Sequence, residues 1–252
     1  MSVLDIADLS ASIDGKKILQ NLSLRAHTGE IHLLIGPNGA GKSTFARVLA
    51  GAPNYEVEAL KCSIDGESLL HMTSEERAHQ GLFVSFQHPV EIPGLMNEQF
   101  LRLAYNAHRK AQGLEPMAPS LFHSLVEQYR EALGISPELL RRELHVGFSG
   151  GEKKRNEMLQ VLLFQPKVVI FDEIDSGVDL DAMRIIVDKI KELSSKSIVV
   201  VISHYPQFIA QIQPDYVHIM SEGRLVHSGG EEVVAHVEKD GYDAVCTKRA
   251  CD

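Results

Sequence analysis

The chain is poor in cysteine, with only Cys62, Cys246 and Cys251 among its 252 residues. So few cysteines exclude the disulfide framework of a small secreted domain and fit a reducing compartment. Cys246 and Cys251 have a C-x-x-x-x-C spacing, but no histidine or third cysteine stands beside them at ligand spacing. We therefore expect a solvated tail at these positions, with a metal or cluster site as the alternative.

Long apolar runs are also absent, since none approaches the ~20 residues that a bilayer-spanning helix needs. The N-terminal residues 1–5 are acidic and lack the basic and apolar segments of a signal peptide. We therefore expect a cytoplasmic protein that does not insert into a membrane.

Basic residues do not outnumber acidic ones: 25 Lys and Arg stand against 34 Asp and Glu, which gives a net charge of −9. Because no positive excess is available to neutralise phosphates, nucleic acid is not expected as a primary partner. The twelve histidines show no H-E-x-x-H or other paired ligand spacing, so a structural zinc site is not expected. The hydrophobic share of 44% and charged share of 23% are ordinary for a globular protein.

What the chain does contain is a glycine-rich stretch with the pattern G-x-x-x-x-G-K-S. It follows the apolar run 31–35, typical of a buried parallel strand, and precedes residues 45–50, which read as the first turns of a helix. Strand, glycine-rich loop and helix are the context in which this pattern indicates a phosphate-binding loop. A plain glycine-rich turn is the alternative. The candidate phosphate-binding residues are Gly36, Pro37, Asn38, Gly39, Ala40, Gly41, Lys42, Ser43 and Thr44.

The residue types in this stretch suit a bound triphosphate. Glycines let the backbone turn tightly with its N–H groups directed at an anion, and a helix N-terminus adds to the attraction. Lys42 adds a positive charge for the outer phosphates, and Ser43 offers a hydroxyl to Mg²⁺.

Two further apolar runs end in polar side chains. The run 168–171 ends at Asp172 and Glu173, and the run 82–86 is followed by Gln87. Polar residues at strand ends of α/β sheets face the ligand crevice. If the strand that ends at Asp172 neighbours the phosphate-loop strand, Asp172 would hold a metal and Glu173 would polarise an attacking water.

The apolar strand 197–203 ends at His204, a third polar strand end. A lone histidine is more often structural than catalytic. His204 stands at the end of a third strand, after the strands that end at the phosphate loop and at the carboxylates. This position favours a hydrogen bond or proton transfer from His204 to a terminal phosphate.

Between these motifs, residues 88–145 are expected to form an α-helical insert, with helices at 96–110 and 118–133. The second helix carries an apolar stripe through either Leu121 and Leu125 or Phe122 and Val126. We interpret the stripe as a small core, with a partner-docking surface as the alternative. The sequence thus predicts a catalytic core of residues 1–87 and 146–252 with the insert 88–145.

The insert ends before Ser149-Gly150-Gly151-Glu152, in which Ser149 and Glu152 have capping-box spacing. On local evidence alone this is a well-capped helix, although a second glycine-rich helix N-terminus could also admit a phosphate.

The order of these motifs resembles that of the ATP-binding cassette (ABC) ATPases across essentially the whole chain. The motifs are the phosphate loop, Gln87, Ser149–Glu152, the strand ending at Asp172 and Glu173, Asp179 and His204. The resemblance implies an α/β fold with a mixed or parallel core sheet, an antiparallel β-layer and a helical insert. It implies a Mg²⁺-dependent ATPase in which Gln87 senses the metal and Glu173 activates water. It also implies that the signature Ser149, Gly150 and Gly151 contacts ATP held by a second copy, in a transient ATP sandwich, and that Asp179 is a further nucleotide-binding residue.

The run Phe148–Glu157, with residues 172–177 and 214–218, is similar to the SufC branch, the ATPases of iron–sulfur cluster assembly. That resemblance implies docking to SufB- and SufD-like scaffold proteins near the Gln87 loop and the helical insert. The chain departs from the wider family at Glu152, where many members have Gln, and near Ile13, where an adenine-stacking aromatic is missing.

Three alternatives remain beside this reading. The first is the nucleotide-binding subunit of a membrane transporter, and the identity of the docking partner would distinguish it from a scaffold-bound ATPase. A chromosome-maintenance or repair ATPase would need a long coiled-coil insertion, for which the insert is too short. A non-hydrolysing binding module is disfavoured because Glu173 and His204 are both present.

Overall fold

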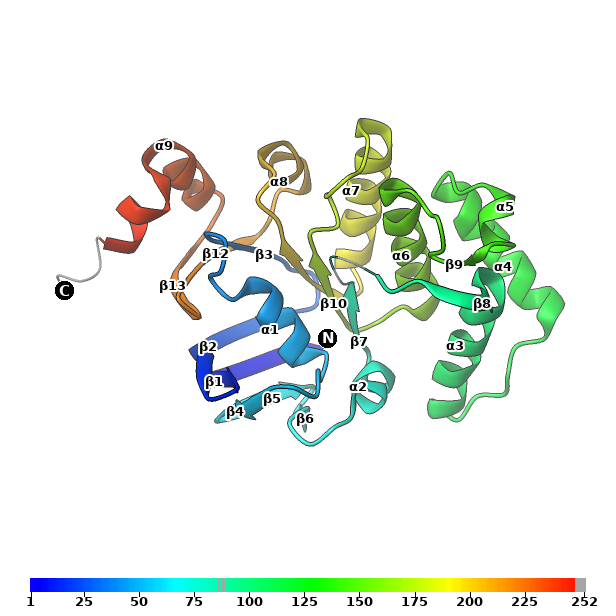
Figure 1. The fold of residues 1–252 in the computed structure, drawn as a ribbon, viewed down its shortest axis with the longest axis horizontal. Helices are drawn as coiled ribbons and strands as arrows, with labels where there is room; N and C mark the ends of the chain where they lie inside the picture. The colour runs from blue at the N-terminus through cyan, green and yellow to red at the C-terminus, as the bar shows by residue number, and fades with distance from the viewer. Residues whose placement is uncertain (86, 88, 248–252) are drawn as a thin grey trace.

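The structure is a computed structural model that describes residues 1–85, 87 and 89–247, with the backbone alone for residues 240 and 243–247 (Figure 1). The backbone of Cys246 belongs to the last helix, α9 (Glu232–Thr247), while its side chain, Cys251 and the last residue of the predicted strand 82–86 fall outside what is described.

A central sheet with the strand order β13-β12-β3-β11-β10-β7 runs through the molecule. The strands from β12 to β7 are parallel, and β13 pairs with β12 in the antiparallel sense. Every residue of β3, β10 and β11 is buried, as expected for parallel strands covered on both faces. Their bounds are β3 (Ile31–Ile35), β7 (Leu82–Ser85), β10 (Val168–Asp172), β11 (Ile198–Ile202), β12 (Tyr216–Ser221) and β13 (Arg224–Gly229).

Successive side chains of these strands point to opposite faces of the sheet, so each face of the sheet has its own core. Leu33 and Phe171 pack on the face covered by helices, and Leu34 and Ile170 pack on the opposite face against α1 (Lys42–Leu49). Figure 1 shows the covering helices side by side along one edge of the view. They are α6 (Gly150–Phe164), α7 (Leu180–Ser194), α8 (Pro206–Ile212) and α9 (Glu232–Thr247), the last kinked at Gly241.

An antiparallel layer closes the α1 face, as the resemblance to the ABC ATPases implies, and the turn Asp14-Gly15 joins its first two strands. Its strands have the order β2-β1-β5-β6, and β4 also pairs with β1. Asp14 and Gly15 both have positive φ, 49° and 74°, which is typical of tight hairpin turns. The elements are β1 (Val3–Ile13), β2 (Lys16–His27), β4 (Glu56–Glu58), β5 (Lys61–Ile64) and β6 (Glu67–Ser68), followed by α2 (Ser74–Gln80).

The segment between β7 and α6 is mainly helical, and it contains a strand pair that the sequence did not indicate. Phe122 and Val126 are buried while Leu121 is 64% exposed, so the second of the two stripes forms the local core. The elements are β8 (Ile92–Met96), α3 (Asn97–Ala111), α4 (Pro119–Ala132), α5 (Pro137–Leu140) and β9 (Glu143–Leu144), with β8 and β9 paired.

The register of the parallel strands brings their carboxyl ends to one edge. Ile202 of β11 is paired with Leu34 of β3 on one side and with Asp172 of β10 on the other. On the far side of β10, Phe171 is paired with Ser85 of β7. The strand of Asp172 is therefore not a direct neighbour of the phosphate-loop strand, because β11 lies between them. The residues that follow all four strands nevertheless meet at the same edge.

On the paired strands β3 and β12, the buried imidazoles of His32 and His218 lie 2.9 Å apart, Nδ1 to Nε2. With both rings neutral, His218 donates to His32, which donates to the Glu30 carboxylate, 3.1 Å away. Ser228 Oγ donates to His218 Nδ1 over 2.8 Å. Burial, reinforced by His32, lowers the pKa of His218 from 6.5 to about 4, so this network requires an uncharged His218.

We expect stability to fall as the pH drops from about 6.5 to about 4, because there the unfolded chain binds a proton at His218 and the folded chain does not. The interval between the two pKa values corresponds to about 3 kcal/mol of unfolding free energy. His218→Gln, whose amide can still donate to His32, should flatten this dependence in urea unfolding at pH 7.5 and pH 5. The exposed His71 supplies the control, His71→Gln. If the unfolding free energy of the two variants changed equally between pH 7.5 and pH 5, His218 would not be the source of the pH dependence.

Candidate active site

The loop between β3 and α1 has the geometry of a phosphate-binding loop. Gly36, Gly39 and Gly41 all have positive φ, at 153°, 81° and 105°. A Cβ on Gly36 would lie 2.1 Å from the backbone oxygen of Met220, so no side chain fits there. The turn delivers the first amides of α1 to the carboxyl edge of the sheet, where an anion gains from both N–H groups and helix dipole.

Lys42, the first residue of α1, folds back over the loop. Its Nζ donates to the backbone oxygens of Gly36 and Pro37, at 2.7 Å and 3.0 Å. Burial lowers the pKa of Lys42, and the nearby carboxylates of Glu173 and Asp172 oppose that effect. The ammonium is therefore held at the phosphate loop by acceptors that a bound phosphate can replace.

Ser43 and Asp172 form a pair suited to a divalent cation. Ser43 Oγ donates to Asp172 Oδ1 over 3.2 Å, and Asp172 is only 2% exposed. Burial raises the pKa of Asp172, an effect that the Ser43 hydrogen bond opposes. A buried carboxylate beside a hydroxyl matches the oxygen ligands that Mg²⁺ prefers, and a cation there would offset the desolvation of the acid.

Glu173, Gln87 and His204 converge from three different strand ends. Gln87 Nε2 donates to Glu173 Oε2, and His204 Nδ1 lies 3.7 Å from Glu173 Oε1. Glu173 has a φ of 55°, rare for a residue with a side chain, and its N–H donates to Ile202 O over 3.0 Å. That backbone turn aims the carboxylate across the edge of the sheet toward both partners.

Ser43, Gln87, Glu173 and His204 line one cavity of about 760 Å³, whereas the buried Asp172 contacts Ser43 without lining the cavity itself. It is bounded by the predicted residues from Gly36 to Thr44 together with Gln87, Glu173 and His204. Two further lining residues, Ile18 and Tyr242, were not predicted. Tyr242 follows the kink at Gly241, and its phenol lies within hydrogen-bonding reach of the Gly36 backbone. No local motif marks either residue, since both are brought in by distant elements.

The remaining predicted residues do not line this cavity within one chain. Ser149 caps α6: its Oγ accepts from Glu152 N over 3.2 Å, and Glu152 Oε2 accepts from Ser149 N over 2.7 Å. A Cβ on Gly150 would lie 2.9 Å from the Gly177 backbone oxygen, so the start of α6 packs on the loop after β10. Gly151 follows in the first turn of the same helix.

Asp179 likewise caps a helix, accepting from Ala182 N over 2.7 Å at the start of α7. It lines a second cavity of about 710 Å³, which shares His204 with the first. Buried Asp175 lines it too, accepting from Ser203 Oγ over 2.9 Å, and burial raises the pKa of Asp175. The capping residues of α6 and α7 are therefore presented beside the phosphate-loop cavity and not inside it.

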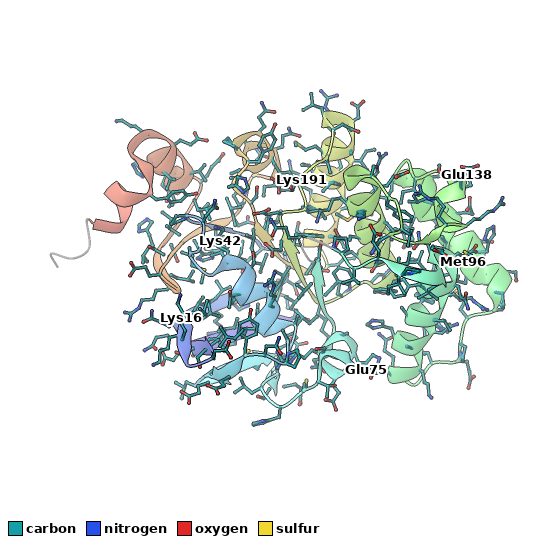
Figure 2. All side chains as sticks on the ribbon, in the orientation of Figure 1. Lys16, Lys42, Glu75, Met96, Glu138 and Lys191 are labelled. Atoms are coloured by element: carbon teal, nitrogen blue, oxygen red, sulfur yellow. The ribbon has the colours of Figure 1, made fainter. Side chains whose placement is uncertain are left out.

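Figure 2 places Lys42 at the start of α1, while Met96 and Glu138 mark the helical segment on the far side of the molecule. The phosphate loop therefore lies in the core of the molecule, away from that helical segment.

A parallel sheet with a lysine-bearing phosphate loop, and with two carboxylates at the end of a strand that reaches the same edge, defines a P-loop nucleotide-binding protein. A family model described as ABC transporter matches residues 19–176, and the chain belongs to this family. It is an ATPase of the ABC type, and its fold agrees with the α/β architecture expected from the sequence.

Named relatives agree with this assignment. The chain is 44% identical over 242 residues to "Probable ATP-dependent transporter ycf16" of Cyanophora paradoxa, covering 96% of this chain and 93% of that protein. It is 43% identical over 241 residues to "Probable ATP-dependent transporter SufC" of Escherichia coli (strain K12), covering 95% and 97%. The chain thus belongs to the SufC/ycf16 group, which confirms the resemblance seen in the sequence.

Among solved structures, the crystal structure of a nucleotide-free ATP-binding cassette from an ABC transporter superposes with a TM-score of 0.75. The two chains are 24% identical, and the match covers 95% of this chain and 96% of the other, so it supports the fold. Among the residues described here, no helix combines the length and apolar character that crossing a bilayer requires.

Proposed function

We propose that the cavity binds Mg-ATP with its triphosphate on residues 36–44 and that Glu173 activates the attacking water. The single observation that carries this proposal is the convergence of Glu173, Gln87 and His204 over the phosphate loop. Lys42 exchanges its loop carbonyls for phosphate oxygens. Ser43, Asp172 and Gln87 would hold the magnesium, which would neutralise phosphate charge.

The chemistry of the chain's own groups follows from their positions. The Glu173 carboxylate accepts the proton of the water that attacks the terminal phosphate. Gln87 donates to that carboxylate and so fixes its orientation. His204, which is 65% exposed at its side chain, lies on the open side of the cavity and donates to the terminal phosphate.

We further propose that two copies enclose the nucleotide. Ser149, Gly150, Gly151 and Asp179 lie at helix N-termini outside the cavity of their own chain. An anion is favoured at such N-termini. A second copy placed against this face completes the site with these residues, and hydrolysis separates the two copies.

We propose that the chain works as a catalytic core of residues 1–87 and 146–252, with the helical insert of residues 88–145 attached to it. An apolar groove of about 390 Å³ is lined by α2, β7 and Phe164 of the core, and the insert contributes His108. β7 leads directly to Gln87, so a protein seated in the groove is coupled to the site. We propose SufB- and SufD-like scaffold proteins of iron–sulfur cluster assembly as the occupants.

Ala78 of α2 lines this groove. We expect Ala78→Glu to lose the scaffold partners in affinity purification while it retains ATP binding, because a buried carboxylate opposes an apolar contact. The exposed Glu75 on the same helix gives the matched control, Glu75→Gln, which should keep them. Unchanged capture of the scaffold proteins by Ala78→Glu would place docking elsewhere.

A second candidate, the nucleotide-binding subunit of a membrane transporter, is favoured by the words "ATP-dependent transporter" in the names of the relatives. Identification of the proteins that co-purify with the tagged chain decides between the two. Soluble SufB- and SufD-like proteins support the scaffold, and an integral membrane permease overturns it.

A further inference from the structure

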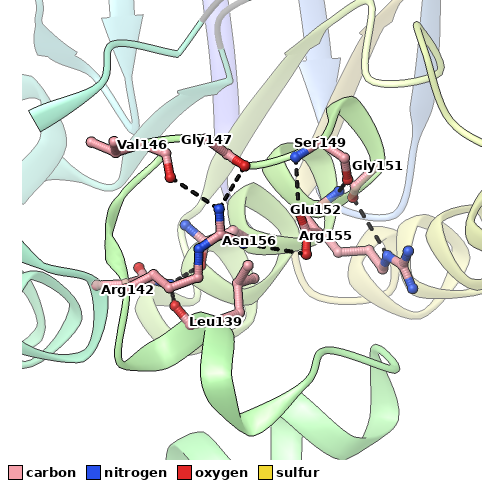
Figure 3. Close-up of polar contacts among 10 residues, drawn as sticks. Leu139, Arg142, Val146, Gly147, Ser149, Gly151, Glu152, Arg155 and Asn156 are labelled. Carbon is pink, nitrogen blue, oxygen red and sulfur yellow. Dashed lines mark hydrogen bonds and ion pairs between the residues drawn. The ribbon is translucent and has the colours of Figure 1, made fainter.

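Arg142 joins the helical segment to the loop that precedes α6 (Figure 3). It follows α5, and its backbone oxygen accepts from Asn97 N at the start of α3 over 2.9 Å. Its backbone is thus fixed to the helical segment, while its side chain reaches toward Ser149 and the residues around it.

The guanidinium contacts this loop at consecutive positions. Nη2 donates to the backbone oxygens of Val146, over 3.1 Å, and of Gly147. The guanidinium carbon lies 4.8 Å from the centre of the Phe148 ring, a cation–π contact. One planar group therefore fixes two carbonyls and an aromatic ring in the three residues before Ser149.

The same side chain also contacts the cap of α6. Arg142 Nη1 lies 3.6 Å from Glu152 Oε1, while Glu152 Oε2 accepts from Ser149 N. Glu152 therefore bridges Arg142 to the backbone of Ser149. A Cβ on Gly147 would lie 3.2 Å from Arg142 Nη2, so the glycine leaves space for the guanidinium. Only arginine supplies a planar fork of this kind, since a lysine ammonium is a point charge.

We propose that Arg142 is a positioning residue for Ser149, Gly150 and Gly151, which it orients toward ATP bound by a second copy. The inference rests on the proposed two-copy site. Arg142 contacts neither its own phosphate loop nor the cavity around it. At 39% exposure of the side chain, its ion pair with Glu152 contributes little to stability, so its position matters chiefly for the geometry of the loop.

The first test compares Arg142→Ala and Arg142→Lys with Arg141→Ala, an exposed neighbouring arginine. Because a small displacement of a positioned group lowers the rate strongly, we expect Arg142→Ala to lower kcat about 10- to 100-fold. The Kd for ATP of the single chain should stay within about twofold, since its own phosphate loop is intact. Arg142→Lys should recover only part of kcat, and Arg141→Ala should match the wild type. A weakened Kd with unchanged kcat would overturn the inference.

The second test mixes two impaired variants. Lys42→Ala has an intact Ser149 loop but no working phosphate loop. Arg142→Ala has an intact phosphate loop but a displaced Ser149 loop. Each alone is nearly inactive. In a mixed dimer the phosphate loop of the Arg142→Ala copy meets the Ser149 loop of the Lys42→Ala copy, so one complete site forms and ATPase activity recovers. A folding defect in either variant gives no such recovery.

Mixing Lys42→Ala with Ser149→Ala separates the possible failures. Recovery in both mixtures supports the role of Arg142. Recovery with Ser149→Ala but not with Arg142→Ala overturns that role and leaves the two-copy site standing. Recovery in neither mixture overturns the two-copy site itself, and with it the positioning role.

Discussion

Glu173→Gln lowers the rate of ATP hydrolysis by at least about 100-fold, because the amide cannot accept a proton from the attacking water. ATP binding is retained, since the substitution removes neither the phosphate loop nor the Ser43–Asp172 pair. The new side chain has nearly the same shape, and in the proposed site it also removes a negative charge that would face the terminal phosphate. We therefore expect ATP to hold two copies together, seen as a dimer in size-exclusion chromatography with Mg-ATP.

Asp188→Asn provides the matched control, because it makes the same carboxyl-to-amide change at an exposed position of α7. It should hydrolyse ATP at the wild-type rate. Release of phosphate and binding of a fluorescent ATP analogue are measured on the same samples. Wild-type turnover by Glu173→Gln would show that another group serves as the base.

Lys42→Ala lowers the affinity for ATP by about 100-fold, because it removes a charge-assisted contact to the outer phosphates. Hydrolysis falls with it at any ATP concentration below saturation. The folded state is affected little, since the Gly36 and Pro37 carbonyls that Lys42 now satisfies can accept from water instead. Titration calorimetry gives the affinity, and thermal unfolding checks the fold.

Lys196→Ala, at an exposed lysine after α7, should bind ATP as the wild type does. The two substitutions remove the same charge from the chain, so a general electrostatic effect would act on both alike. Equal ATP affinity for Lys42→Ala and Lys196→Ala would remove the phosphate loop from nucleotide binding.

Local signals in the sequence predicted those parts of the fold that depend on short-range geometry. The phosphate loop is specified by glycines at positive φ between a buried strand and a helix. The capping box at Ser149 and Glu152 is likewise set by neighbours in the chain. In each case the residue types dictate a backbone turn that needs no distant partner.

Features that depend on sheet order could not be predicted in this way. The sequence placed Asp172 near the phosphate loop on the condition that their strands were neighbours, yet β11 lies between them. Ser43 reaches Asp172 because α1 starts at the shared edge, and His204 enters from the intervening strand. Strand order is set by packing over the whole sheet, which no single segment encodes.

The same reason explains the residues that were missed. Ile18 lies on β2 and Tyr242 follows a glycine kink in α9, and both reach the cavity only through the folded chain. The β8–β9 pair joins segments 47 or more residues apart, from Met96 to Glu143, and short strands of this kind carry weak local signals. Arg142 has no motif of its own, because its role comes from the carbonyls that it contacts.

A crystal structure of the Glu173→Gln variant with Mg-ATP tests the proposed site most directly. We expect the triphosphate on the amides of residues 38–44 of one copy, magnesium between Ser43 and Asp172, and Ser149 of the second copy at the terminal phosphate. The side chain at position 173, Gln87 and His204 should surround that phosphate. A triphosphate bound away from the loop, or a terminal phosphate that none of these three side chains approaches, would contradict the proposed mechanism.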